Sequence, residues 1–154
     1  MSKVFLSIHV LAAILAIGPV AVAASMFPAA LKRGDRATLV LLNRICRVYA
    51  AVSIAVPLFG FAVAGTMKVT GQTWVLVSIA LTAVAAVVLV AFVLPGQRAA
   101  LDEPSADGGA AGGGGVAVAT RLSGRLAMTT GVFNLLWAVV TVVMIVRPGS
   151  STGV

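Results

Sequence analysis

The sequence predicts an all-α protein that crosses a membrane with four helices, and three observations lead to this fold class. Of its 154 residues, 60% are hydrophobic, and the mean hydropathy is +1.12. Only 10% are charged, whereas a soluble domain is about 45–50% apolar and about 25% charged. This composition argues against a soluble enzyme, a nucleic-acid-binding module and a disordered tail. The third observation is that the few charges leave four long gaps, which predict a single membrane domain over residues 1–154.

Each gap is long enough for one membrane-spanning helix. The uncharged stretches hold 28 residues after Lys3, 20 after Arg47, 29 after Lys68 and 21 after Arg125. A helix needs about 20 apolar residues to cross the hydrocarbon layer, and in lipid an isolated segment satisfies its backbone only as a helix. The predicted spans are 4–27, 45–66, 72–95 and 125–146.

Prolines mark the expected ends and bends of these helices. The first, third and fourth spans are predicted to end at Pro28, Pro95 and Pro148. Pro19 and Pro57 instead lie inside spans, where a missing amide removes a helical hydrogen bond. Pro57 is expected to leave the carbonyl of Ser53 without its helical partner.

The joins between spans have distinct compositions. Residues 96–124 include a run rich in glycine, which predicts a flexible loop. Asp35 is a plausible N-cap, so the second helix is expected to begin before the bilayer core, with Asn43, Arg44 and Arg47 in contact with water. Short turns favour sequential helices as neighbours in the bundle.

The basic residues predict the orientation. Eight Lys and Arg residues lie in or beside segments 28–44 and 96–124, against three on the other side. The positive-inside rule therefore places these two loops in the cytoplasm and both termini outside, in an up-down-up-down bundle of the inner (plasma) membrane. Because the charges sit at helix ends, they favour anionic lipid head groups over nucleic acid, chiefly at Arg44, Arg47, Arg121 and Arg125.

His9 is the sole histidine and the first candidate site residue. It lies about 9 Å along the first helix from Lys3, at 1.5 Å per residue. Ala12, Ala13 and Ala16 follow on the same helical face and form a groove of small residues. The groove fits either a haem or copper ligand with space for the cofactor, or close helix packing in which the histidine bonds a neighbour.

The fourth span carries a polar stripe at offsets of four, seven and eleven residues: Thr130, Asn134, Trp137 and Thr141. Asn134 is close to mid-membrane, where it either bonds another helix or, with Trp137, faces a cofactor. Met67 and Met144 lie at a depth similar to that of His9, and a His–Met pair suits haem iron or copper. Cys46, the only cysteine, is expected to pack.

Three short segments carry a family resemblance. They are Leu6-Ser7-Ile8-His9-Val10-Leu11-Ala12-Ala13 followed by Gly18-Pro19, then Phe133-Asn134, then Val143-Met144-Ile145-Val146-Arg147-Pro148-Gly149. The chain thereby resembles small uncharacterised bacterial four-helix integral membrane proteins, related to copper-resistance D-like proteins and distantly to the HemJ-type membrane protoporphyrinogen oxidase. The resemblance implies a four-helix bundle with His9 as a haem ligand. The oxidase's acid after the Phe-Asn pair is Leu135 here, and its lysine is missing from 75–79, so His9 alone carries over.

Apart from Arg47 and Arg125 at span ends, no formally charged residue lies inside a predicted span, which argues against a proton relay, an ion-coupled carrier or a voltage sensor. The sequence therefore favours a non-enzymatic accessory or structural subunit, or a small homo-oligomer, with no catalytic residue assigned and no cofactor. The alternative is a membrane redox protein that binds haem b or copper through His9. The expected partners are membrane lipids and either another membrane protein or further copies of this chain.

Overall fold

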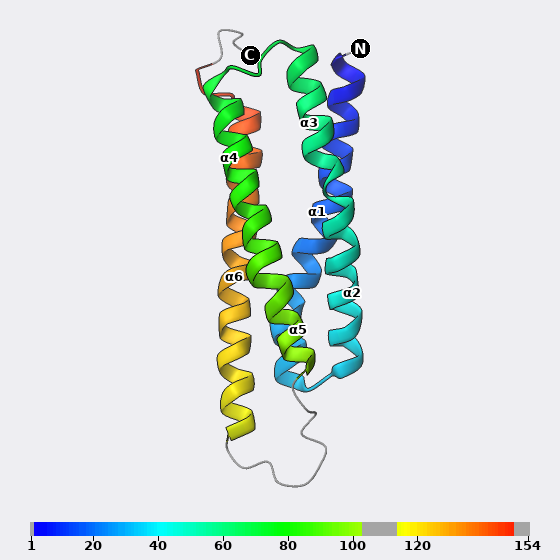
Figure 1. Ribbon diagram of the computed structural model, residues 1–154, viewed down its shortest axis with the longest axis vertical. Coiled ribbons are helices and arrows are strands. Elements are labelled where there is room, and N and C mark those ends of the chain that lie inside the picture. Colours follow the sequence, from blue (N-terminus) through cyan, green and yellow to red (C-terminus); the bar gives the residue numbers. More distant parts are fainter. Residues whose placement is uncertain (1, 103–113, 150–154) are drawn as a thin grey trace.

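The computed structural model describes residues 2–102 and 114–149, and this part of the chain is almost entirely helical and contains no strand (Figure 1). The all-α class predicted from composition is therefore confirmed. The helices in chain order are α1 (Ser2–Arg33), α2 (Arg36–Val52), α3 (Ala55–Thr66), α4 (Thr73–Val88), the π-helical turn η1 (Leu89–Val93), α5 (Leu94–Asp102) and α6 (Gly114–Val146).

Four helical segments are long and apolar enough to cross a membrane, as the charge gaps predict. They are Val4–Arg33, Arg36–Thr66, Thr73–Asp102 and Ala117–Val146, called spans one to four below. Each holds 30 or 31 residues, which is about 45 Å of helix. Because the hydrocarbon core is only about 30 Å thick, each helix is long enough to continue into the head-group region.

The helices extend beyond the predicted span boundaries at the end that carries most of the basic residues. α1 runs through Pro28 to Arg33 and α6 begins at Gly114, whereas the start of α2 at Arg36 is the one predicted from Asp35 as N-cap. The prediction that Pro28 ends the first helix is wrong. A charge ends an apolar stretch, but it does not end a helix whose Lys and Arg heads can reach water.

The predicted inner loop 96–124 is also too long. Its residues up to Asp102 belong to α5, and those from Gly114 onward belong to α6. Residues 103–113, with most of the glycine run, lie outside the described residues. A loop assignment from composition therefore fails at both of its boundaries, where helical residues were grouped with the glycine run.

Pro95 does not end the third helix, because a wider turn precedes it. Within η1 the backbone adopts π-helical spacing, and the amide of Leu94 donates to the carbonyl of Leu89, five residues back. A proline ring normally clashes with the carbonyl four residues earlier. The extra residue in the π turn relieves this constraint, so the helix continues through Pro95 into α5.

The turn between α1 and α2 is ordered by Gly34 and Asp35. Gly34 adopts a left-handed φ of 68°, and the Asp35 amide donates to the carbonyl of Ala30 at 3.2 Å, which satisfies a free carbonyl at the end of α1. Asp35 then accepts from the amide of Thr38 at 3.0 Å and from its hydroxyl at 2.6 Å. These bonds confirm Asp35 as an N-cap, and they lower the pKa of its carboxyl, the hydroxyl bond most.

Span two is broken at Ser53 and Ile54, which separate α2 from α3. Pro57 has no amide to offer the carbonyl of Ser53, but that carbonyl accepts from the amide of Val56 at 3.0 Å instead. The expectation of an unpartnered carbonyl at Ser53 is therefore wrong. A tighter turn, with hydrogen bonds between residues three apart, replaces the helical bond that Pro57 cannot make.

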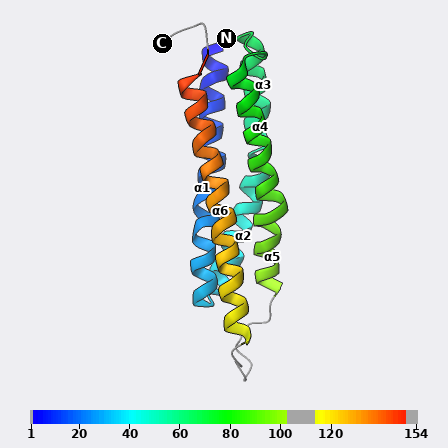
Figure 2. The same ribbon diagram turned by 90° about the vertical axis from the view of Figure 1, so that its left-hand side faces the viewer.

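The four spans form an elongated bundle in which the start of α1 and the end of α6 lie at the same end (Figures 1 and 2). α1 contacts α2, α3 and α6, and α4 contacts α6. Spans two and three contact each other mainly through α2 and α5, near the opposite end. The expectation that sequential helices are neighbours thus fails for most of the length of spans two and three.

The buried core lies where α1, α2, η1 and α6 meet, and its largest fully buried apolar side chains are Phe27, Phe133, Val20 and Val93. Large apolar side chains also cover the outside of the bundle: Leu15, Leu58, Met128, Leu135 and Ile145 are each 64–70% exposed. A soluble protein rarely exposes apolar patches of this extent. The outer surface therefore suits lipid rather than water.

Candidate functional site

His9 lies in the contact between α1 and α3 and is only 8% exposed. Its Nδ1 donates to the carbonyl oxygen of Val56 at 2.9 Å. The imidazole packs directly against Gly60, one turn further along α3, where an added Cβ would lie 3.0 Å from Cε1 of His9. Of the two arrangements that the sequence left open, this geometry favours close helix packing, with the histidine bonded to a neighbouring helix.

Met67 and Met144, the methionines predicted as further ligands, are half-buried, and neither sulfur forms a hydrogen bond within the described residues. Within the same residues, no three His, Cys, Asp or Glu side chains cluster as a metal site would require. His9 lines neither of the two cavities described below.

The residues of the polar stripe on α6 differ in their hydrogen-bond partners and in their exposure. Asn134 donates through Nδ2 to the hydroxyl of Ser25 on α1 at 3.0 Å, and that hydroxyl donates to the carbonyl of Ala21 at 2.7 Å. Thr141 is exposed and bonds the carbonyl of Trp137 on its own helix. Of the alternatives for Asn134, the bond to Ser25 fits interhelical contact.

Three polar atoms of this stripe stay buried without a partner in the described part of the chain: Oγ1 of Thr130, Oδ1 of Asn134 and Nε1 of Trp137. The Trp137 ring meets Phe133 edge-on, with ring centroids 6.4 Å apart and an interplanar angle of 71°. Trp137 thus packs into the interior as an aromatic pair, which leaves its N–H unused by protein groups.

A polar cluster that sequence reasoning missed lies between α2 and α5. Nδ2 of Asn43 donates to Oε1 of Gln97 at 3.1 Å, and Nε2 of Gln97 donates to the sulfur of Cys46 at 3.5 Å. Gln97 and Cys46 are 0% exposed and Asn43 is 6% exposed. The expectation that Asn43 contacts water is wrong, because its face of α2 turns toward α5 while Arg44 and Arg47 stay exposed.

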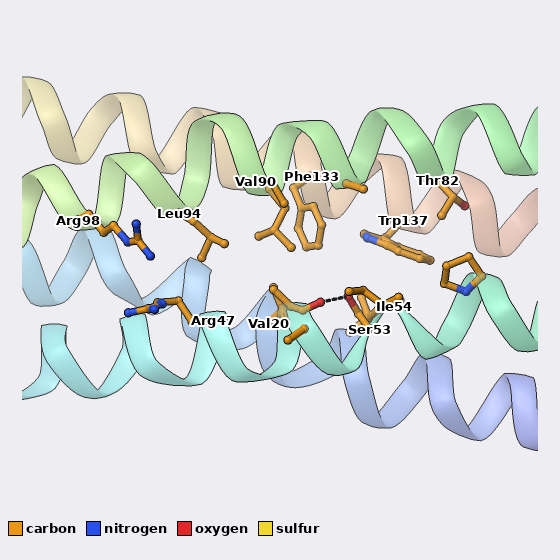
Figure 3. Close-up of a pocket in the computed structure, with 16 residues that line it drawn as sticks. Val20, Arg47, Ser53, Ile54, Thr82, Val90, Leu94, Arg98, Phe133 and Trp137 are labelled. Atoms are coloured by element: carbon orange, nitrogen blue, oxygen red, sulfur yellow. Dashed lines mark hydrogen bonds between the residues drawn. The ribbon is translucent and has the colours of Figure 1, made fainter.

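A groove of about 370 Å³ opens between spans two and three, where these spans fail to pack (Figure 3). Apolar side chains line most of it, including Val20, Ile54, Val90, Leu94 and Phe133. Two basic side chains close one end, Arg47 from α2 and Arg98 from α5, and Figure 3 shows both guanidinium groups at that end of the groove. Its volume lies within the range of about 300–1,000 Å³ found for ligand sites.

The two arginines of the groove are unpaired in the described part of the chain. Neither Arg47 nor Arg98 forms an ion pair or a hydrogen bond with any residue that the structure describes. Asp102 lies one helical turn after Arg98 on α5, yet it makes no ion pair with it. A second, shallower hollow lined by Arg44, Arg47 and Leu101 adjoins the same end of the groove. Arg47 was predicted as a lipid contact, whereas Arg98 was not singled out.

The other predicted basic pair, Arg121 and Arg125, is exposed on α6 and lines neither cavity. At the opposite end of the bundle, the guanidinium of Arg147 lies 5.6 Å from the ring centroid of Trp74, a cation–π contact between the end of α6 and the start of α4. These residues mark the two ends of the apolar surface, as interfacial side chains do.

Comparisons of this chain with family models, curated proteins and solved structures gave no match. The resemblance carried by the short segments around His9, Phe133 and Val143 therefore stays a prediction. What is established at this point is an all-helical chain with four helices of membrane-spanning length and apolarity.

Proposed function

We propose that this chain is a small, non-enzymatic, multi-pass protein of the plasma membrane that is either an accessory or structural subunit of a larger assembly or a small homo-oligomer. It crosses the bilayer up-down-up-down with both termini outside and segments 28–44 and 96–124 in the cytoplasm. The proposal assigns no catalytic residue and no cofactor.

One observation carries the proposal: several interior polar side chains form hydrogen bonds to a neighbouring helix. His9 links α1 to α3, Asn43 and Gln97 link α2 to α5, and Asn134 links α6 to Ser25 on α1. Hydrogen bonds between membrane helices contribute about 0.6 kcal/mol on average and about 1.7 at most. Side chains used in this way stabilise one arrangement of the bundle, which suits a rigid subunit with an apolar outer surface.

The orientation is supported by the distribution of basic residues. Eight lie at the end that holds the α1–α2 turn and three at the other. Cytoplasmic leaflets carry anionic lipids, and each Lys or Arg near such a surface contributes about 1 kcal/mol. Arg44, Arg47, Arg121 and Arg125 are exposed at that end, where they would contact anionic head groups.

The decisive experiment is extraction of the protein with its surrounding lipid in polymer-bounded nanodiscs, followed by mass measurement and identification of co-purified chains. We expect an assembly of fixed stoichiometry that is heavier than the 15.5 kDa monomer. A discrete monomer in discs made directly from its native membrane would overturn the accessory or homo-oligomer function. Protein expressed alone in a foreign host supplies the control for a partner chain.

The alternative function, a haem- or copper-binding redox protein, has one supporting observation. Nδ1 of His9 donates to a backbone carbonyl, and metal-binding histidines are commonly fixed in this way with Nε2 free for the metal. The same preparation tests it through its visible spectrum and copper content. A Soret band or stoichiometric copper that is lost in His9→Ala would replace the non-enzymatic proposal. A colourless, metal-free protein from cells supplied with both would exclude the redox function.

A further inference from the structure

The groove between spans two and three is charged at one end only. Arg47 and Arg98 come from different helices, lie at the same end of the groove and have no partner among the described residues (Figure 3). Two unpaired guanidinium groups on facing helices attract an anion, and Arg binds phosphate through paired N–H donors. The nearest carboxylate along α5, Asp102, does not neutralise Arg98 through an ion pair.

The apolar part of the groove has the length of one bilayer leaflet. Along span two its wall runs from Arg47 to Pro57, which is ten residues or about 15 Å of helix. Half of a hydrocarbon core about 30 Å thick is the same length. Val90, Leu94 and Phe133 line the opposite side. In a bilayer, such a groove would lead from a cationic end at the membrane surface to the middle of the membrane.

We propose that this groove binds one anionic glycerophospholipid from the surrounding membrane. Its phosphate lies between Arg47 and Arg98, and one of its acyl chains lies along the apolar wall toward Pro57. The lipid thereby fills the space that spans two and three leave between them. This site requires only that the chain is embedded in a bilayer, so it does not depend on the accessory function proposed above.

Chemistry argues against the two other occupants of such a groove. An apolar membrane helix would cover the apolar wall but leave the guanidinium groups of Arg47 and Arg98 without an anion. A free phosphate ion would pair with the arginines but leave the apolar wall uncovered. An amphiphile with one anionic head and a slender chain matches both features.

The head-group contact is tested by native mass spectrometry of the purified full chain in detergent with added phosphatidylglycerol or phosphatidylcholine. We expect wild-type protein to retain one phosphatidylglycerol at least tenfold more tightly than phosphatidylcholine. The double variant Arg47→Gln/Arg98→Gln should lose this preference. Lys32→Gln/Arg33→Gln removes the same number of charges at the same end of the bundle, outside the groove, and should keep it. Equal loss in both double variants would overturn the proposal, since the preference would then follow overall charge.

The acyl-chain contact needs a separate variant. Val90→Trp fills the groove, whereas Val87→Trp places the same ring on the lipid-facing side of α4. The two valines are matched, with 61% and 58% exposure, but only Val90 lines the groove. We expect Val90→Trp to reduce phosphatidylglycerol retention at least fivefold and Val87→Trp to leave it unchanged. Circular dichroism and gel filtration check that both variants fold.

Two further outcomes would overturn the proposal. If inorganic phosphate or glycerol phosphate competes with the lipid at equal concentration, the site binds an anion and the acyl chain contributes nothing. If the lipid is absent and a second protein chain protects Val90 from a chemical label in nanodiscs, the groove is a protein interface. Protection of Val90 that appears only when phosphatidylglycerol is supplied supports the lipid site.

Discussion

Nδ1 of His9 lies 2.9 Å from the carbonyl oxygen of Val56, and this contact joins the first membrane helix to the second just after the second one breaks. The ring fits because Gly60 offers no Cβ on the face of α3 that it covers. His9, which the sequence suggests as a possible ligand, thus lies in an interhelical contact. This contact depends on Gly60, 51 residues further along the chain.

The contact between His9 and Gly60 predicts that Gly60→Ala destabilises the protein when His9 is present and stabilises it when His9 is replaced by Ala. Gly60→Ala places a Cβ 3.0 Å from Cε1 of His9, and overpacking of this kind costs about 1–3 kcal/mol. In a His9→Ala background the ring is gone, and the same change should stabilise the helix by up to about 1 kcal/mol, the propensity difference between Gly and Ala. Reversible unfolding in mixed micelles measures the free energies.

Gly65→Ala is the matched control for that cycle, because nothing lies within 4 Å of an added Cβ on this other glycine of α3. It should be neutral or stabilising with either residue at position 9. If Gly60→Ala has the same effect in both backgrounds, the imidazole does not pack against Gly60 and the α1–α3 contact is not the one described.

The buried pair Asn43 and Gln97 predicts a second cycle. Gln97→Leu alone leaves the Asn43 amide without its partner in a fully buried contact, and an unsatisfied group of this kind costs about 1–3 kcal/mol. Adding Asn43→Leu removes the orphaned group and should recover most of the loss. Asn134 bonds Ser25 in a separate contact, so Gln97→Leu with Asn134→Leu should instead be additive. Additivity in both pairs would show that Asn43 and Gln97 are not coupled.

The number of spans could be predicted from the sequence because charge is excluded from the bilayer core. The four gaps between charged residues correspond to the four apolar helices of the structure. The ends of those helices could not be predicted in this way. Arg36 and Asp102 are charged and still helical, because the backbone can continue in a helix where its side chains are already in water.

The contact between Asn43 and Gln97 and the groove could not be predicted from the sequence, for a different reason. Asn43 stands beside Arg44 and was expected to share its exposure, but adjacent residues on a helix point in different directions. Gln97 lay in a stretch assigned to a loop by its composition. Arg47 and Arg98 are 51 residues apart, and only the incomplete packing of spans two and three shows that they share one cavity.

The N-cap of α2 predicts a pH dependence at acidic pH. Hydrogen bonds from the hydroxyl and amide of Thr38 lower the pKa of the exposed Asp35 carboxyl below its usual value of about 3.9. A lowered folded-state pKa means that the cap contributes stability above the unfolded pKa and loses it as the pH falls through the folded one. The Thr38 amide resonance should therefore titrate with a midpoint below about pH 3.9. Asp35→Asn keeps the acceptor without a titrating group, so its Thr38 resonance should stay constant, and a titration that persists would assign the pKa to another group.

The proposed orientation is tested by labelling single cysteines in a Cys46→Ser background, because the one native thiol is buried between α2 and α5. Ala37 is exposed at the start of α2, and Thr70 is exposed in the turn between α3 and α4. With intact spheroplasts and a membrane-impermeant maleimide, Thr70→Cys should be labelled and Ala37→Cys protected. Both should react after lysis, which controls for reactivity. The reverse pattern would place both termini in the cytoplasm, and the eight basic residues at the α1–α2 end would then face outward against the positive-inside rule.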